Sequence, residues 1–373
     1  MKNIYCLFAI IIGCLKAIFD VKRTNVSAII LAYSATELLE ARAFLQDAQN
    51  GKIQQNELRR PPTGALQAFI DSTPALIMGG NDTLKRIKES SEQVTKVPVL
   101  TKLAATNGTA RKCGASGPEG DSAMVTLSYG TLVEDFSMSE LLYRNNLVKY
   151  QEALRHNFME VFRNLHNRLE TLMTGFLETN KSLVNDGSIN TFNAGTGTMS
   201  VLQANKAQFF ASIMAEMGEN DFNAPFLNVH TMNQRMIQML QQLEGSGNSN
   251  NLAPQQSGFS HYGSNNFGAA ATGQTTSFIF IPGTVGLIGP WLNGLHRDGA
   301  DIGTDTWTTV PDPFIPGWNW ELKIKRACTD NTSISASRSA DLVTQFVISG
   351  EFSRVKAYTS DTDTGIYKYT LLA

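Results

Sequence analysis

Cysteine is scarce in this sequence of 373 residues, and its four cysteines form no recognisable pattern. Cys6, Cys14, Cys113 and Cys328 include no CxxC pair, and none lies near histidine at the spacing of a zinc site. A disulfide framework is also not expected at this density in so long a chain. The cysteines therefore indicate a reducing compartment.

Charged residues are also few, at 17% of the chain, against about 25% in typical soluble proteins. The formal net charge is -2, and the sequence shows no basic domain or stripe. Proteins that read nucleic acid usually carry such a stripe, so tight binding of nucleic acid is excluded. Low charge together with 42% hydrophobic residues suits a chain that buries much of its surface against copies of itself.

Catalytic motifs are absent as well. The sequence contains no GxSxG elbow and no HExxH helix, and neither GKS nor GKT follows the glycine-rich stretch Gly195–Gly197. We interpret that stretch as a loop. His261 and Tyr262 lie in a polar segment without a partnered nucleophile, so we interpret them as surface residues. The sequence therefore predicts a protein that is not an enzyme, with no catalytic, cofactor-binding or metal-binding residue.

The first 19 residues conflict with a reducing compartment. Lys2 precedes an apolar run over residues 4–13, which is typical of the charged start and short core of a secretion signal. The run Ile11–Cys14 also resembles a bacterial lipobox, in which Cys14 would be lipidated. It is too short to span a bilayer, which needs about 20 apolar residues. A buried helix and a start codon assigned too far upstream are the other two interpretations.

Residues 35–75 predict an N-terminal arm with brief helices, because Pro61 and Pro62 interrupt the helical spacing that begins at Ala35. Further along, apolar residues at 94–100 and 124–133 form two strand candidates, separated by the polar segment Ala104–Ser122. This pattern predicts an extended β-hairpin. A hairpin alone buries little surface, so we expect this one to lie on a neighbouring molecule.

The strongest periodic pattern runs from Asn146 to Leu177. Its apolar residues recur at steps of three and four, and no proline interrupts them. The sequence therefore predicts one long helix of about 48 Å, at about 1.5 Å per residue. A coiled coil fits less well, because the apolar stripe is wide and heptads are not sustained.

The remaining chain mixes helices with strands. Helices are expected over residues 201–217 and 231–243, with a short buried strand at Phe226–Val229 between them. Further strands are expected at residues 277–281, 285–288, 320–324, 342–348, 352–358 and 366–371. Because strands and helices do not alternate regularly, the fold class is α+β rather than a series of βαβ units.

This order of elements resembles the Hong Kong 97-type fold of tailed-bacteriophage major capsid proteins. Short stretches at the matching places also look similar to that family: Val97–Pro98, Ala110–Arg111, Val125–Leu127, Glu134–Ser139, Met217–Phe222 and Phe280–Gly286. The resemblance covers about residues 70–350. It rests on the order and spacing of the elements more than on any single motif.

The resemblance implies five successive parts of the chain. The first is an N-terminal arm over 1–80, of which 1–19 would be a signal or a misassigned start. An extended β-hairpin loop over 81–140 and a long spine helix of the peripheral domain over 141–190 follow. A mixed axial domain over 191–350 and C-terminal strands over 351–373 complete the expected order.

The function implied is that of a structural protein that assembles with itself into the hexamers and pentamers of an icosahedral shell. The shell would enclose a phage double-stranded DNA genome, contacted non-specifically, in a virion assembled in the host cytoplasm. A scaffolding protein and a portal are further expected partners, and neither a membrane nor a cofactor is expected. Four charged hairpin residues are predicted to contact the adjacent subunit: Arg111, Lys112, Glu119 and Asp121.

Two other functions remain open from the sequence. An encapsulin-like nanocompartment shell would use the same fold without a genome. Gene neighbours would separate these two, since a terminase and portal mark a phage and a cargo enzyme marks a nanocompartment. A secreted or lipidated bacterial surface-binding protein is favoured only by residues 1–14, and labelled fatty acid on Cys14 would support it.

Overall fold

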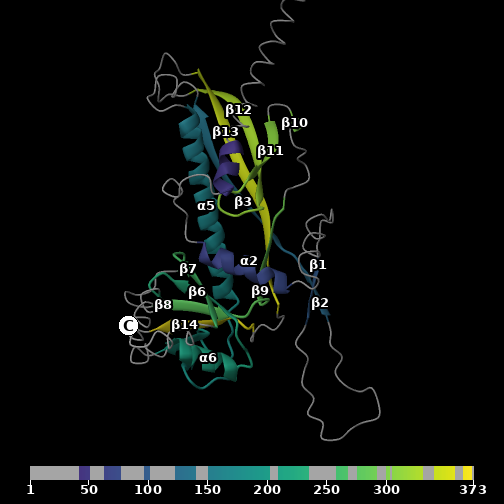
Figure 1. Ribbon diagram of the computed structural model, residues 1–373. Coiled ribbons are helices and arrows are strands. Elements are labelled where there is room, and N and C mark those ends of the chain that lie inside the picture. Colours follow the sequence, from purple (N-terminus) through teal and green to yellow (C-terminus); the bar gives the residue numbers. More distant parts are fainter. Residues whose placement is uncertain are drawn as a thin grey trace, which may run out of the picture. The chain divides into compact units, whose positions relative to one another are not determined.

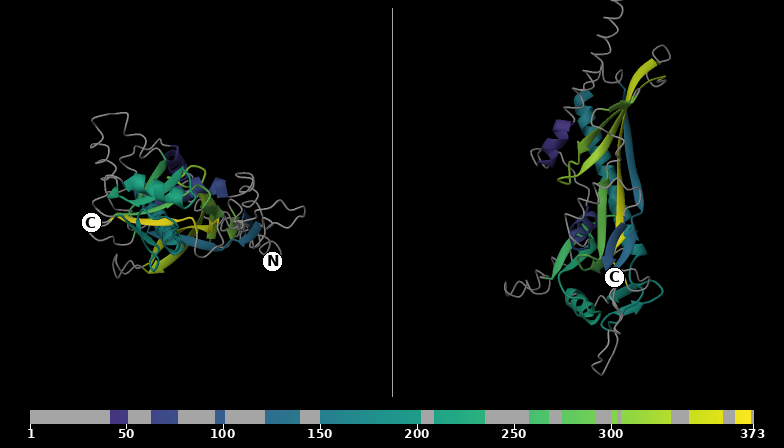
Figure 2. Two further views of the ribbon diagram at one scale, coloured as in Figure 1. Left: turned by 90° about the horizontal axis from the view of Figure 1, so that it is seen from below. Right: turned by 90° about the vertical axis from the view of Figure 1, so that its right-hand side faces the viewer.

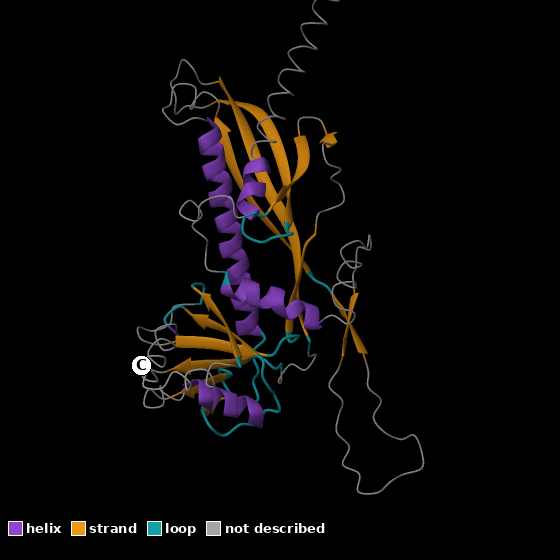
Figure 3. Ribbon diagram, viewed as in Figure 1, coloured by secondary structure: helices purple, strands orange, loops and turns teal. Residues whose placement is uncertain are grey.

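The computed structural model describes residues 42–50, 63–76, 96–100, 122–139, 150–201, 209–234, 258–267, 275–291, 300–302, 305–330, 340–357 and 364–371. Contacts within the chain divide it into two compact units, each assembled from separate stretches. Unit 1 comprises Met1–Leu58, Phe136–Glu160 and Asp298–Phe346, and unit 2 comprises Arg59–Asp135, Val161–Arg297 and Val347–Ala373. Helices and strands occur together throughout (Figures 1 and 3), so the expected mixture of helix and sheet is confirmed.

Unit 1 is built on antiparallel strands. β10 (Ala300–Ile302), β11 (Asp305–Pro311) and β12 (Asn319–Asp330) pair in chain order. β13 (Ala340–Lys356) and β3 (Tyr129–Ser139) continue this sheet, and residues 340–346 and 136–139 of these two strands belong to unit 1. The first turns of α5 (Tyr150–Thr179) contribute Phe158, whose ring centroid lies 5.0 Å from that of Phe136 and 5.5 Å from that of Phe346. These three rings, one from each of three elements, form an aromatic cluster inside the unit.

Unit 2 contains a sheet in the order β4-β5-β14-β8-β6-β7. Its strands are β4 (Thr191–Asn193), β5 (Thr198–Val201), β6 (Phe226–Thr231), β7 (Phe259–Ser264), β8 (Thr275–Phe280) and β14 (Tyr367–Leu371). The pairs β5–β14 and β6–β7 are parallel, and the other described pairs of this sheet are antiparallel.

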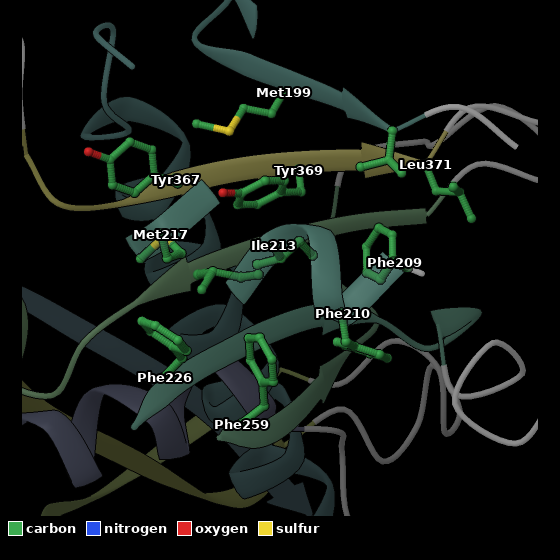
Figure 4. Packing of buried hydrophobic residues seen from close by; sticks show 12 residues of the cluster. Met199, Phe209, Phe210, Ile213, Met217, Phe226, Phe259, Tyr367, Tyr369 and Leu371 are labelled. Atoms are coloured by element: carbon green, nitrogen blue, oxygen red, sulfur yellow. The ribbon is translucent and has the colours of Figure 1, made fainter. Parts of the chain in front are cut away.

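The helix α6 (Phe209–Glu219) closes the core of this sheet. Phe209, Ile213 and Met217 recur every four residues, so they lie on one face of the helix. That face packs against buried side chains of the strands, including Phe226 and Tyr369 (Figure 4). All six residues of β6 are buried, which confirms the expected buried strand at Phe226–Val229.

The helix α2 (Gly64–Leu76) is packed into unit 2. Ala65, Leu66 and Phe69 have no exposed surface. The backbone N–H of Leu287, in β9 (Val285–Trp291), donates to the Thr73 hydroxyl at 2.9 Å. This part of the expected N-terminal arm is therefore a buried helix, because its apolar face has a sheet to pack on. The earlier expected helix is confirmed over residues 42–49, in unit 1.

The predicted hairpin and the predicted long helix are both confirmed. β1 (Lys96–Leu100) and β2 (Ser122–Thr126) form an antiparallel pair, with Lys96 opposite Thr126. No other described strand pairs with either of them. The long helix is α5, with 30 residues. Residues 101–121, which include the expected hairpin tip, and residues 140–149 lie outside the described part of the chain.

Three element boundaries differ from expectation. The strand expected over 124–133 is two strands, β2 and β3, which lie in different sheets. Val201 and Thr231, expected to begin helices, each end a strand, and residues 235–243 of the second expected helix lie outside the described part. β14 belongs to the sheet of β5 and β8, while β10 to β12 lie in the other sheet. The expected division into an axial domain over 191–350 and C-terminal strands over 351–373 stays a prediction.

The two strands expected at 342–348 and 352–358 are one strand, β13, drawn in yellow in Figure 2. Buried residues alternate along it at Thr344, Phe346 and Ile348, as a half-buried strand requires. The pairing of β13 with β9 then shifts between Glu351 and Ser353. Such a bulge changes which residues face inward without ending the strand, and here the neighbours Phe352 and Ser353 are both buried.

Candidate functional site

The four hairpin residues predicted to contact a neighbouring subunit, Arg111, Lys112, Glu119 and Asp121, lie outside the described residues. Their role therefore stays a prediction. In the described part of unit 2, buried charged groups fix two segments of the chain in place.

Glu170 of α5 lies in the interior of unit 2 and has no exposed surface. Its Oε1 accepts the backbone N–H of Ala65 at 2.7 Å, and its Oε2 accepts that of Leu66 at 2.9 Å. These first-turn N–H groups of α2 have no partner within their own helix. Burial raises the pKa of Glu170, although hydrogen bonds from Ser264 and the two backbone groups oppose the shift. The carboxylate thus fixes the start of α2.

A second buried carboxylate, Glu216 of α6, holds the segment between α5 and β4. Glu216 has no exposed surface. Its Oε1 accepts a hydrogen bond from the side-chain amide of Asn185 at 2.7 Å, and its Oε2 accepts the backbone N–H of Asn190 at the same distance. Gly187 lies so close that a Cβ there would be 2.4 Å from Glu216 Oε1. The carboxylate therefore determines the path of this segment.

Our interpretation of the sequence missed both carboxylates, although each leaves a signal. Glu170 lies between Leu169 and Met173 on the apolar stripe of α5, and Glu216 lies beside Met217 on that of α6. A charged residue at such a position is costly to bury unless it is paired and hydrogen-bonded. It therefore predicts a specific polar partner, but not which one.

His230 of β6 and His261 of β7 lie in neighbouring parallel strands, with ring centroids 5.8 Å apart. The ring of Phe210 lies 5.2 Å from that of His261. Burial, and to a smaller extent the nearby His230, lowers the pKa of His261 to about 4. The expected surface position is therefore wrong for His261, which is half-buried in a strand beside an aromatic core.

We expect the free energy of unfolding to decrease as the pH falls from about 6.5 to about 4, because the pKa of His261 is lowered from 6.5 to about 4 in the folded chain. The unfolded chain takes up this proton first, so protonation favours unfolding across that window. The variant His261→Gln should show a flatter pH dependence. Urea unfolding at pH 7.5, 6 and 5 would measure it, and equal slopes in both proteins would contradict the prediction.

The stretch Gly195–Gly197 is a turn between β4 and β5, as predicted. The backbone N–H groups of Gly195 and Thr196 donate within the turn to oxygens of Asn193, at 3.0 and 3.2 Å. An open groove of about 500 Å³ lies beside it. Because two of its three backbone N–H groups are already bonded inside the turn, the stretch has few donors left for a phosphate.

Two lysines in this groove pair with one carboxylate. Lys181 forms an ion pair with Glu178, and Lys368 Nζ lies 2.9 Å from Glu178 Oε2. Partial burial raises the pKa of Glu178, but the two lysines outweigh it, so the pKa lies below its usual 4.5. The ion pairs join the end of α5 to β14.

Among the residues that the structure describes, no group of three or more His, Cys, Asp or Glu side chains could hold a metal ion. In the same stretches, no helix is both long and apolar enough to cross a membrane. In the described residues of unit 2, the buried carboxylates of Glu170 and Glu216 hold neighbouring segments in place by hydrogen bonds.

No protein-family model matches the chain, and no curated protein matches it. Solved structures do match. The capsid structure of the cyanophage P-SCSP1u is 11% identical and covers 76% of this chain and 84% of that chain, with a TM-score of 0.44. The cyanophage Pam1 capsid is 11% identical and covers 84% and 92%, with a TM-score of 0.44. The capsid of Ralstonia phage GP4 is 8% identical and covers 76% and 84%, with a TM-score of 0.42. These three solved structures are phage capsids.

Proposed function

We propose that the chain is the major capsid protein of a tailed bacteriophage, and that its copies assemble into an icosahedral shell of hexamers and pentamers around double-stranded DNA. The observation that carries this proposal is the order of elements. The hairpin β1–β2 precedes the 30-residue helix α5. After α5 come a sheet that is covered by α6 and then the long antiparallel strands. This order resembles that of the Hong Kong 97-type fold, and in our proposal α5 is the spine helix and the sheet that contains β4 to β8 and β14 belongs to the axial domain.

The hairpin supports a function based on contact between copies. A two-stranded hairpin is marginally stable alone in water. Open strand edges tend to pair with other chains, and among the described strands β1 and β2 pair only with each other. Packing on an adjacent copy would add contacts to those that the two strands make with each other. One heterologous contact repeated around an axis closes into a ring, which is how one chain makes hexamers and pentamers.

The partners of this function follow from the same proposal. A scaffolding protein and a portal would help to build the shell, which would be assembled in the host cytoplasm and become part of the virion. The net charge of -2 suits a lining that tolerates packed DNA without binding it tightly.

Assembly of the purified protein tests the proposal. The full chain and residues 35–373 would be expressed and compared by size-exclusion chromatography and negative-stain microscopy. Closed shells, or rings of five or six subunits, support a capsid function, and packaged DNA or a cargo enzyme then separates a phage from a nanocompartment. Monomers at every concentration, also in the presence of the scaffolding protein, would contradict the proposal. A full chain found in the membrane fraction would favour a lipidated surface protein.

Deletion of residues 107–121 is expected to leave a folded protein that forms no shells. The physical reason is that the predicted hairpin tip contributes contacts to a neighbouring copy and none to its own core. Circular dichroism would check the fold, and microscopy would check the assembly. A variant with alanine at Arg111, Lys112, Glu119 and Asp121 keeps the hairpin length and tests the charges alone. Normal shells from the deletion would argue against the hairpin as an assembly element.

A further inference from the structure

Large apolar side chains that remain exposed gather at two places in unit 2. Among the described residues, these side chains are between 39% and 45% exposed: Val133, Leu172, Leu183, Val184 and Ile189. Single exposed apolar residues need no explanation, but residues gathered at one place mark contact surfaces.

The first place is the segment over residues 182–190, between α5 and β4, which we name the anchored loop. It carries Leu183, Val184 and Ile189, while its polar groups are bonded elsewhere in unit 2. These bonds run from Ser182 N to Ile366 O at 2.7 Å, Asn185 Nδ2 to Glu216 Oε1 at 2.7 Å, Asp186 N to Asn220 Oδ1 at 2.9 Å, and Ser188 N to Glu219 Oε2 at 2.7 Å. Because the loop is already ordered, a partner would bind it with little loss of conformational entropy.

The second place, which we name the helix–strand patch, consists of Val133 of β3 and Leu172 of α5. Arg168, one turn before Leu172 on α5, donates to the backbone oxygen of Val133 at 2.8 Å and pairs with Glu134 at 2.5 Å. Arg354 of β13 donates to the backbone oxygen of Leu172 at 3.1 Å. The two guanidinium groups therefore bind the backbone beside the two apolar residues, and the carboxylates of Glu134 and the exposed Asp135 follow Val133 on β3.

The anchored loop is acidic, whereas the helix–strand patch carries two arginines beside the two carboxylates of β3. Asp186 is exposed within the anchored loop, and the exposed Glu219 and Asp221 lie on either side of Asn220, which binds the loop. In the helix–strand patch, the Arg168 side chain is 50% exposed, and Arg354 is exposed as well. Two anchored loops facing each other would oppose carboxylates to carboxylates. An anchored loop facing a helix–strand patch would pair carboxylates with guanidinium groups, which favours that partner.

We propose that the anchored loop of one copy binds the helix–strand patch of a second copy, placing Leu183, Val184 and Ile189 against Val133 and Leu172. This inference rests on the proposed function, because it names a contact by which the copies assemble. Two different surfaces meet, so the contact is heterologous and can repeat around an axis into a ring. Apolar burial provides the affinity, and the charges select the heterologous pairing over like-with-like pairing.

Chemical cross-linking between copies tests the contact. The four native cysteines are replaced by serine, and two differently tagged preparations carry Ile189→Cys or Leu172→Cys. The two proteins are assembled together and treated with a short bismaleimide, and linked dimers are sorted by their tags. Mixed dimers are expected to exceed same-site dimers by about tenfold, because two acidic anchored loops that face each other repel. Ala211→Cys, at an exposed position on α6 outside the loop, is the matched control and should link weakly to Leu172→Cys.

Charge reversal gives a second measurement that separates contact from folding. Asp186→Lys and Arg354→Glu should each weaken self-association by about tenfold, and the double variant should recover most of the loss. Circular dichroism would show whether each variant is folded. A double variant no better than either single variant would count against the pairing of these charges.

The outcomes distinguish this contact from the proposed function. Shells that form without mixed dimers, or with links between two Ile189→Cys copies, overturn the contact and leave the capsid function standing. A chain that never self-associates overturns both. Mixed dimers in assembled shells, together with recovery in the double variant, support both.

Discussion

The variant Glu170→Ala is expected to lower the free energy of unfolding by about 3 kcal/mol, the cost of leaving buried hydrogen-bonding groups without partners. Glu170 accepts the N–H groups of Ala65 and Leu66 at 2.7 and 2.9 Å, and none of its surface is exposed. Alanine would leave both N–H groups of α2 unpaired in the interior. Urea unfolding followed by circular dichroism would measure the loss.

The pH dependence of this loss has a definite sign. Burial raises the pKa of Glu170 above 4.5 in the folded chain, so the folded state favours the protonated side chain. Its contribution to stability is therefore fully present below the unfolded pKa and decreases as the pH rises through the folded pKa. The loss in Glu170→Ala should be larger at pH 4.5 than at pH 7. Glu170→Gln, which keeps one acceptor oxygen and removes the titration, is the matched control. An alanine variant within 0.5 kcal/mol of the wild type, roughly the scatter of neutral substitutions, would refute this role.

The variant Asp312→Ala should destabilise unit 1 by about 3 kcal/mol or more, for the same reason. Asp312 has no exposed surface, and one of its oxygens accepts the backbone N–H groups of Phe314 and Ile315 at 2.7 and 2.9 Å. The other oxygen accepts the indole N–H of Trp320 at 2.7 Å. Trp320 is fully buried, so its N–H would lose its acceptor in the interior.

Tryptophan fluorescence during denaturant unfolding would follow this change directly. Asp312→Asn is the control, because its amide oxygen can still accept from Phe314 and Ile315 while its NH₂ group cannot accept from Trp320. An intermediate loss is expected for asparagine. If both variants unfolded at the wild-type denaturant concentration, Asp312 would not hold this turn together.

Elements that depend on local periodicity could be read from the sequence. The steps of three and four along α5 follow from the geometry of a helix, and the structure has that helix at Tyr150–Thr179. The hairpin β1–β2 was readable because two apolar runs flank a long polar segment. In β13 the same approach divided one strand into two, because Ser349 and Gly350 look like a turn in the sequence although the strand runs through them.

The sequence itself determined the fold class, the long helix, the hairpin and the absence of catalytic motifs. Each of these follows from residues that lie close together in the chain. The pairing of Glu170 with α2 joins residues about one hundred positions apart, and only the tertiary structure decided it. The same holds for His261, which the sequence placed on the surface and the structure places beside Phe210. A sequence shows that a charged or polar residue interrupts an apolar pattern, but its partner is chosen by packing between distant segments.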